Sequence, residues 1–408
     1  MKPLGPIPHG FNDKDGILSI GSKDVRELVR EAGGTPLFVY SRQMVADRVA
    51  LLRRALPERV HVHYAIKANP FPALLQAMSE LVDGFDVASG GELQKLLELG
   101  VAAGRISFAG PGKRDAELAA ALAAGATLNL ESEAEAERAL RLAGELGVTA
   151  RMAIRVNPDF DLKGSGMKMG GGAKPFGLDA ERVPALARRI AAAGAEWRGF
   201  HIFAGSQAIS ADAIIEAQAR TLALAARLAS ESGLALPHLN LGGGFGIPYF
   251  PGDAPLDVMA VGAALAERMA DLPPELAQTE FCVELGRYLV GEAGVYLTTV
   301  IDRKVSHGEV FLVCDGGMHH QLAASGNFGT VVRRNYPVAI ATRFGAPVEE
   351  EASVVGCLCT PLDRLADKGG FPRAEPGDLV AVFCAGAYGA TASPMQFLGQ
   401  GPAREIMV

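Results

Sequence analysis

The sequence predicts an α/β protein made of a parallel (β/α)8 TIM barrel followed by an antiparallel β-sandwich or β-barrel domain. From about residue 35 to 283, short β-rich runs alternate with Ala/Leu-rich helical stretches, and roughly eight such units in about 250 residues are typical of a barrel. From about residue 285, strands follow one another with few helices between them, as in an antiparallel domain. A doubly wound parallel sheet shares the βαβα alternation and is the alternative.

The expected elements follow in order along the chain. The runs that we expect to be strands of the barrel region are TPLFVYS (35–41), VHVHYAIKA (60–68), GFDVAS (84–89), RISFAG (105–110), TLNLES (127–132), ARMAIRVN (150–157), WRGFHIFAGS (197–206), LPHLNLGGGFGI (236–247) and TEFCVELG (279–286). Later β-rich runs at 288–317, 337–344, 350–360 and 377–389 belong to the second domain. We therefore expect an N-terminal segment over 1–34 that packs on the β domain, a barrel over 35–283 and a β domain over 284–408. The Gly-rich stretch 163–177 is predicted to be a mobile loop at a strand end.

Composition narrows the class of protein. Hydrophobic residues make up 49% of the 408 residues, and the net charge of −7 with no basic run argues against a nucleic-acid partner. No stretch reaches about 18 uninterrupted apolar residues, so we expect no membrane span. The five cysteines form neither a disulfide framework nor a metal-ligand spacing. We expect a cytoplasmic protein without a bound metal.

Lys67 stands where a barrel carries its chemistry. In VHYAIKANP (62–70), apolar and polar residues alternate, and Lys67 projects from the end of the predicted strand, just before a loop. Barrel active sites lie at these carboxyl ends. A lysine at such a place could equally extend its ammonium group into solvent, so other motifs must decide.

Three further strand ends carry candidate groups. In LNLGGGFG (239–246), Gly243 and Gly244 would let backbone N–H groups surround an anion, although a plain glycine turn reads the same way. Ser206 in AGSQ is a second possible phosphate ligand. Glu284 and Arg287 in CVELGRYLVG could form a surface ion pair, or could hold a cofactor's ring nitrogen and an anionic group.

A lysine, a phosphate-binding loop and an acid at three strand ends together fit pyridoxal 5'-phosphate. The lysine would form a Schiff base, the loop would hold the phosphate, and the acid would keep the pyridine nitrogen protonated.

At this point seven ordered motifs, YAIKANP, FDVASGGEL, GFHIFAGSQ, LGGGFGIPY, ELGR, CDGG and GAYG, resemble those of the fold-type III pyridoxal-phosphate decarboxylases, the diaminopimelate/ornithine decarboxylase family. The resemblance implies an alanine-racemase-like barrel in a head-to-tail homodimer with shared active sites. It implies the following cofactor ligands: Lys67 on the cofactor's aldehyde, Glu284 on its ring nitrogen, Ser206, Gly243, Gly244, Arg287 and Tyr388 near the phosphate, Phe203 against the ring, and Asp86 and Glu92 in support. For the substrate it implies Arg287, Cys359, Thr360, Asp363 and Tyr388, with Cys359 of GCLCTPLD as a catalytic acid supplied by the partner chain.

Departures from the family pattern concern the substrate. Phe203 stands where the family usually has a histidine stacked on the cofactor ring, and Thr360 replaces an acidic residue that recognises a distal amine. The Arg-Pro-x-x-Tyr segment of diaminopimelate enzymes is absent after DGGM. These departures predict a neutral, acylated or carrier-linked side chain, as in the branch that resembles decarboxylases of glutamyl groups on acyl-carrier proteins and exosortase-associated decarboxylases.

Three alternatives stay open. A diaminopimelate decarboxylase of lysine biosynthesis would need another acid in place of Thr360. A racemase would need a second base that faces Lys67 across the cofactor. A non-catalytic pyridoxal-phosphate carrier would be a bare barrel, and the β domain with GCLCTPLD argues against it.

Overall fold

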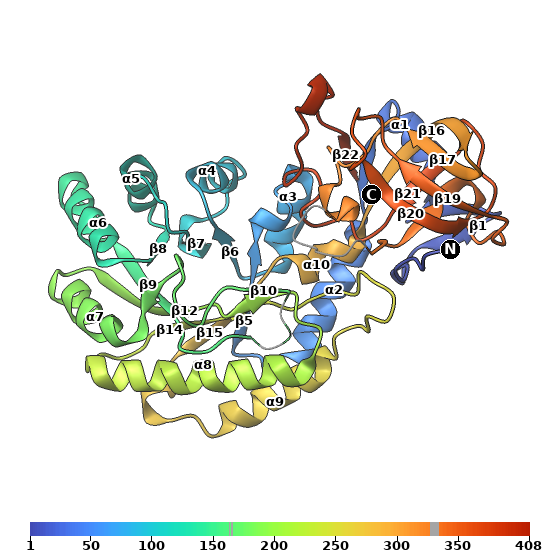
Figure 1. The fold of residues 1–408 in the computed structure, drawn as a ribbon. Coiled ribbons are helices and arrows are strands. Elements are labelled where there is room, and N and C mark those ends of the chain that lie inside the picture. The colour runs from blue at the N-terminus through green and yellow to red at the C-terminus, as the bar shows by residue number, and fades with distance from the viewer. Residues whose placement is uncertain (163, 165, 327–333) are drawn as a thin grey trace.

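The computed structural model describes residues 1–162, 164, 166–326 and 334–408. Eight parallel strands form a closed barrel with helices around it, and a β-sheet domain lies at one side (Figure 1). The barrel strands are β5 (Val60–Ala65), β6 (Gly84–Val87), β7 (Ile106–Phe108), β8 (Thr127–Leu130), β9 (Arg151–Asn157), β12 (Glu196–Ile202), β14 (His238–Gly243) and β15 (Glu280–Leu285). Pairing of β8 with β9 closes the ring. This confirms the predicted barrel and rules out the open doubly wound sheet.

Two of the helices begin at capped turns. Ser89 and Ser132 lie two residues after the ends of β6 and β8, and their hydroxyls accept from the backbone N–H groups of Glu92 and Glu135 three residues on. This Ser-x-x-Glu spacing starts a helix at a defined residue. The helices around the barrel are α2 (Arg42–Ala55), α3 (Pro72–Leu81), α4 (Gly90–Glu98), α5 (Asp115–Ala124), α6 (Glu133–Leu146), α7 (Val183–Ala192), α8 (Ala211–Ser232) and α9 (Val258–Ala270).

The first expected barrel strand belongs to the other domain. β4 (Leu37–Tyr40) pairs antiparallel with β16 (Gly294–Ser306) and parallel with β22 (Arg404–Met407). All four of its residues are buried, as in a barrel strand. The sequence pattern therefore cannot show to which of the two sheets this strand belongs. The barrel therefore begins with β5, and the expected boundary at residue 35 is wrong for this strand.

The β domain is mixed rather than purely antiparallel. Its other strands are β17 (Glu309–Cys314), β18 (Val338–Ile340), β19 (Glu350–Val355), β20 (Arg364–Phe371) and β21 (Leu379–Val382). Most pairs are antiparallel, but β17 and β19 run parallel, as do β4 and β22. The expectation of a purely antiparallel domain is therefore wrong for these two pairs. Both join strands that are not consecutive in the sheet's chain order, a pairing that the sequence pattern does not indicate.

The N-terminal segment packs on this domain. It contains β1 (Asn12–Lys14), β2 (Ile17–Ile20), β3 (Lys23–Asp24) and α1 (Val25–Ala32). Leu18 and Leu28 share a buried apolar cluster with Leu297 and Phe383 of the β domain. This cluster is separate from the large core, which fills the barrel and its helices and extends into the β domain.

The Gly-rich stretch 163–177 is partly paired. Residues 163 and 165 lie outside the described part of the chain. Beyond them, β10 (Met167–Lys168) pairs antiparallel with β13 (Gly205–Ser206), and β11 (Leu178–Asp179) joins β9 at the edge of the barrel. The stretch thus folds back onto the strand end that carries Ser206.

Two further observations concern the described residues as a whole. None of their helices is both long enough and apolar enough to cross a membrane. They contain no group of three or more His, Cys, Asp or Glu side chains arranged to hold a metal ion.

Candidate active site

Lys67 lines a cavity at the carboxyl ends of the barrel strands. It lies two residues past the end of β5, in the 3-10 turn η1 (Ile66–Ala68), rather than in the strand itself, and its side chain is 44% exposed. The cavity is small, with a volume of about 30 Å³. Its lining consists of Ala65, Lys67, Phe203, Ser206, Gly244, Phe245, Glu284, Leu285, Gly286, Arg287 and Tyr388. Six of the predicted site residues therefore come together with Lys67 at one end of the barrel, although they are spread over most of the chain.

Lys67 and Glu284 form the charged centre of this cavity. Lys67 Nζ lies 3.7 Å from Glu284 Oε1, and Glu284 is only 6% exposed. Burial alone would raise the pKa of Glu284, but contact with His201 and the charges of Lys67 and Arg155 lower it to about 2. For Lys67, desolvation lowers the pKa, but Glu284, Tyr388 and Asp86 together raise it above its ordinary value. The carboxylate is therefore anionic throughout the physiological pH range.

A tight glycine loop lies beside these charges. A Cβ on Gly243 would come within 1.9 Å of the Glu284 carbonyl oxygen, and one on Gly244 within 2.1 Å of the Gly205 carbonyl oxygen. Gly244 also has a φ of +79°, which side chains other than glycine rarely adopt. Only glycine fits this backbone, and the phosphate-binding role expected of the loop stays a prediction.

The Ser206 strand end is fastened to that loop. Gln207 donates through Nε2 to the Ile247 carbonyl oxygen at 2.6 Å and accepts from the Ile247 N–H at 3.2 Å. Ala208 N–H donates to the Gly244 carbonyl oxygen at 2.9 Å. Ser206 and Gly244 are thereby held on the same side of the cavity.

Arg287 also lines the cavity and carries a positive charge. Its Nη1 donates to the Tyr249 hydroxyl at 2.7 Å, and its guanidinium carbon lies 4.8 Å from the Tyr388 ring centroid. Its Nε is buried and has no hydrogen-bond partner among the described residues. A buried cation with a free donor is the complement that an anionic group requires.

Phe203 lies next to the lysine. Lys67 Nζ is 5.7 Å from the centroid of the Phe203 ring. The aromatic face is thus present where the family resemblance places a histidine, but it brings no titratable nitrogen.

Asp86 and Glu92 do not line the cavity. Asp86, on β6, is 4% exposed, and its Oδ2 lies 3.3 Å from His63 Nδ1 inside the barrel. Glu92 accepts from the Ala88 N–H at 2.6 Å and so orders the turn before α4. The arrangement gives both residues supporting positions around the strand ends.

The GCLCTPLD loop lies away from the cavity of its own chain. Cys359 is exposed and Thr360 is half-buried, and neither lines the cavity around Lys67. Asp363 is 2% exposed, and its carboxylate accepts from the N–H groups of Met318 at 2.6 Å and Leu358 at 2.9 Å. These contacts anchor the loop that carries Cys359 and Thr360, and the substrate contact expected of Asp363 stays a prediction.

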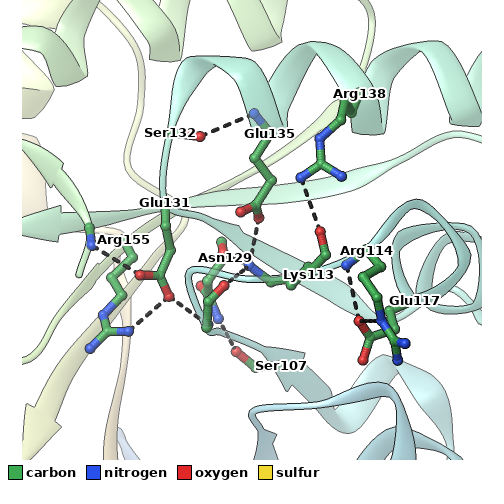
Figure 2. Close-up of polar contacts among 12 residues, drawn as sticks. Ser107, Lys113, Arg114, Glu117, Asn129, Glu131, Ser132, Glu135, Arg138 and Arg155 are labelled. Carbon is green, nitrogen blue, oxygen red and sulfur yellow. Dashed lines mark hydrogen bonds and ion pairs between the residues drawn. The ribbon is translucent and has the colours of Figure 1, made fainter. Parts of the chain in front are cut away.

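Sequence reasoning missed a buried charge network at the neighbouring strand ends (Figure 2). Lys113 is 4% exposed and donates to the carbonyl oxygens of Gly110 and Asn129 and to Glu135 Oε1 at 2.5 Å. Next to it, Glu131 accepts from Arg155 Nη1 at 2.8 Å. Each charge has its partners, so the network fixes the ends of β8 and β9. The sequence signal is an acid directly after a strand.

It also missed His201. This residue lies two positions before Phe203, so strand alternation puts it on the same, barrel-facing side. Its Nε2 lies 2.8 Å from Glu284 Oε2. The alternation of GFHIFAGS could have indicated it.

Together these residues fit pyridoxal phosphate. Gly244 brings backbone without a side chain to the cavity, Arg287 has an unpartnered donor, and Glu284 offers a buried carboxylate beside Lys67. The barrel, the lysine at a strand end and the attached β domain define the class of fold-type III pyridoxal-phosphate enzymes.

Comparison with known proteins narrows this class. A family described as "Pyridoxal-dependent decarboxylase, pyridoxal binding domain" matches residues 42–291. The chain belongs to this family of pyridoxal-dependent decarboxylases, and its cofactor is pyridoxal phosphate. It is an enzyme of amino-acid decarboxylation.

Individual relatives cover nearly the whole chain. L-glutamyl-[BtrI acyl-carrier protein] decarboxylase of Niallia circulans is 35% identical over 91% of this chain and 88% of that protein. Diaminopimelate decarboxylase of Aquifex aeolicus is 33% identical over 92% of this chain and 87% of that protein. Among solved structures, diaminopimelate decarboxylase of M. jannaschii in complex with L-lysine has a TM-score of 0.86 at 27% identity, over 98% of this chain and 93% of that one. SrLDC in complex with PLP and cadaverine has a TM-score of 0.78 at 28% identity, over 96% and 94%.

Proposed function

We propose that this enzyme decarboxylates an L-α-amino acid whose side chain is neutral, acylated or linked to a carrier protein. Thr360 is the observation that carries the proposal. It stands where the resemblance leads us to expect an acid for a distal amine, and an ammonium group brought there would lose hydration without a charged partner. The similarity to a carrier-protein glutamyl decarboxylase supports the same substrate class.

The chain's own residues have distinct tasks in this proposal. Lys67 holds the cofactor covalently, and Ser206, Gly243, Gly244, Arg287 and Tyr388 bind its phosphate. Glu284 keeps the ring nitrogen protonated, because a neighbouring anion favours the charged form. Phe203 covers one face of the ring and keeps water from it. When bound, pyridoxal phosphate supplies an electron sink for the pair left by the departing carbon dioxide.

The final proton needs a donor outside the cavity of a single chain. We assign this role to Cys359 of the partner subunit in a homodimer with shared active sites, with Thr360 beside the substrate side chain. The exposed position of Cys359, away from Lys67 of its own chain, supports a role in trans. Proton transfer by a positioned group contributes about 10²–10⁴-fold to such a step. All five cysteines are free thiols, which agrees with the cytoplasmic location that we propose.

Carbon dioxide release tests the substrate class. We expect kcat/KM for a γ-glutamyl thioester or amide to exceed that for meso-diaminopimelate, lysine and ornithine. A kcat/KM for diaminopimelate of about 10⁴ M⁻¹s⁻¹ or more, above that of the neutral substrates, would show that the enzyme is a diaminopimelate decarboxylase instead. The similarity to several diaminopimelate decarboxylases keeps that reading as the second candidate.

Product analysis separates the remaining alternatives. An inverted amino acid without carbon dioxide would indicate a racemase. A monomer that turns over no amino acid would indicate a cofactor carrier.

A further inference from the structure

His201 is a buried imidazole directly beneath the candidate active site. It lies on β12 and is 2% exposed. In the barrel ladder it is in register with Arg155 of β9 and Asn240 of β14. A buried histidine on a barrel strand is often only part of the core, so its contacts must show whether it has a further task.

The two carboxylate oxygens of Glu284 have different neighbours. Oε2 lies 2.8 Å from His201 Nε2, whereas Oε1 lies 3.7 Å from Lys67 Nζ and faces the cavity. The two atoms are close, but their geometry is not that of a hydrogen bond, and neither Oε2 nor Nε2 has a hydrogen-bond partner among the described residues. One oxygen thus lies against the imidazole, while the other lies on the side of Lys67 and the cavity.

The surroundings make this contact important. Glu284 and His201 are enclosed by the barrel, where an unpaired carboxylate is costly. The titratable groups that face the pair are Lys67 on η1, Arg155 on β9, and His63, Asp86 and Cys282 on β5, β6 and β15. If Lys67 were joined to the cofactor, it would no longer offer a free ammonium group to Glu284, and the imidazole beside Oε2 would gain in importance.

Building on the proposed function, we propose that His201 is a positioning residue for Glu284. It donates through Nε2 to Oε2, so that Oε1 remains anionic and aimed at the ring nitrogen of the cofactor. His201 itself touches neither cofactor nor substrate in this proposal. Its effect should therefore depend on that ring nitrogen and on nothing else in the cofactor.

The test measures the dissociation constants of pyridoxal phosphate and of its analogue with carbon in place of the ring nitrogen. Titration of the apoprotein gives both constants for the wild type, His201→Leu and His201→Gln. Leucine has a similar volume but no donor, whereas glutamine can place an amide N–H near the position of Nε2. We expect the preference for pyridoxal phosphate over the analogue to fall about tenfold or more in His201→Leu and to be largely restored in His201→Gln.

The chain offers a matched control at the other end of the barrel. His238 Nδ1 lies 3.0 Å from Glu280 Oε2, so His238→Leu also removes an imidazole from a carboxylate, far from the cavity. It should leave the preference unchanged. If His201→Leu does not fold, His201→Asn gives the same comparison, because it stays polar but withdraws the donor from Oε2.

The outcomes separate this inference from the function on which it rests. An unchanged cofactor preference in the His201 variants, with a lost preference in Glu284→Gln, would overturn the role of His201 alone. An unchanged preference in Glu284→Gln would show that Glu284 does not pair with the ring nitrogen, and the proposed site assignment would fail as well.

Discussion

The backbone N–H of Tyr388 donates to the carbonyl oxygen of Ala68 at 2.8 Å. Ala68 ends the turn that carries Lys67, and Tyr388 belongs to the β domain. Asn69 adds a second link through its Nδ2, which donates to the Gly386 carbonyl oxygen at 3.0 Å. The lysine of the barrel is therefore fixed in place by the β domain of the same chain, and substitutions on either side can be tested for their effect on the cofactor.

Lys67→Ala should abolish covalent attachment of the cofactor, because no other lysine lines the described cavity. Borohydride reduction followed by peptide mass spectrometry measures this directly. The wild type should carry the reduced cofactor on the peptide that contains Lys67. Reduction of cofactor onto the variant chain would mean that a different lysine forms the link.

Gly244→Ala should weaken cofactor binding strongly, because the added methyl group would collide with the Gly205 carbonyl oxygen and φ is +79°. Gly252→Ala is the matched control: its φ is +86°, but nothing lies within 4 Å of the added Cβ. Both variants pay a similar backbone strain of about 1 kcal/mol. Equal cofactor affinities in the two variants would remove the glycine loop from the phosphate site.

Cys359 should act on the active site of the partner subunit. Lys67→Ala and Cys359→Ala proteins should each be inactive, and their mixture should regain activity in about a quarter of all sites, since half of the dimers mix and one site of each is intact. Subunit exchange is verified by native mass spectrometry with one isotope-labelled variant. Exchange without recovered activity would place Cys359 in its own chain's site or outside the chemistry.

Thr360→Glu should shift the substrate preference toward cationic side chains. A carboxylate there would pair with a distal ammonium, and a charge-assisted hydrogen bond of this kind raises kcat/KM about tenfold or more. The measurement is carbon dioxide release from meso-diaminopimelate and from the neutral substrates, with Thr360→Gln as the uncharged control. An equal gain in the glutamine variant would point to shape rather than charge.

His320 should make the protein less stable in mild acid. Burial, followed by the neighbouring His319, lowers the pKa of His320 from 6.5 to about 4. The unfolded chain therefore takes up a proton below about pH 6.5, whereas the folded chain does so only near 4. The free energy of unfolding should fall as the pH drops through this window, by about 1.4 kcal/mol for each unit of pKa difference.

Urea titrations across that pH range compare the wild type with His320→Gln. The variant should lose less stability between pH 6.5 and 4, whereas His9→Gln, a change at an exposed residue, should follow the wild type. Parallel curves for the wild type and His320→Gln would show that other groups cause the acid sensitivity.

Much of the site could be predicted because its signals are local. Lys67, Gly244 and Glu284 each follow a short apolar run, and parallel strands bring such positions to one end of a barrel. The role of β4 could not be predicted in the same way. Its four apolar residues suit any buried strand, and only the pairing with β16 and β22 assigns it to a sheet.

Side-chain partners were harder still to predict. The motif did not indicate that the Asp363 carboxylate accepts from two backbone N–H groups. His201 lies in the motif GFHIFAGSQ. Its approach to Glu284 depends on the order of the barrel strands, in which β12 and β15 lie on either side of β14. Both outcomes rest on distances that a linear pattern does not contain.

The pairing of β4 with β22 also bears on how the molecule is made. β4 leaves the ribosome long before β22, so its edge cannot be covered until the last strand of this sheet has been synthesised. Until then a short, fully apolar strand is exposed on the nascent chain next to the growing barrel. Truncation before residue 404 should therefore lead to aggregation during translation, even though every residue that lines the cavity would already be present.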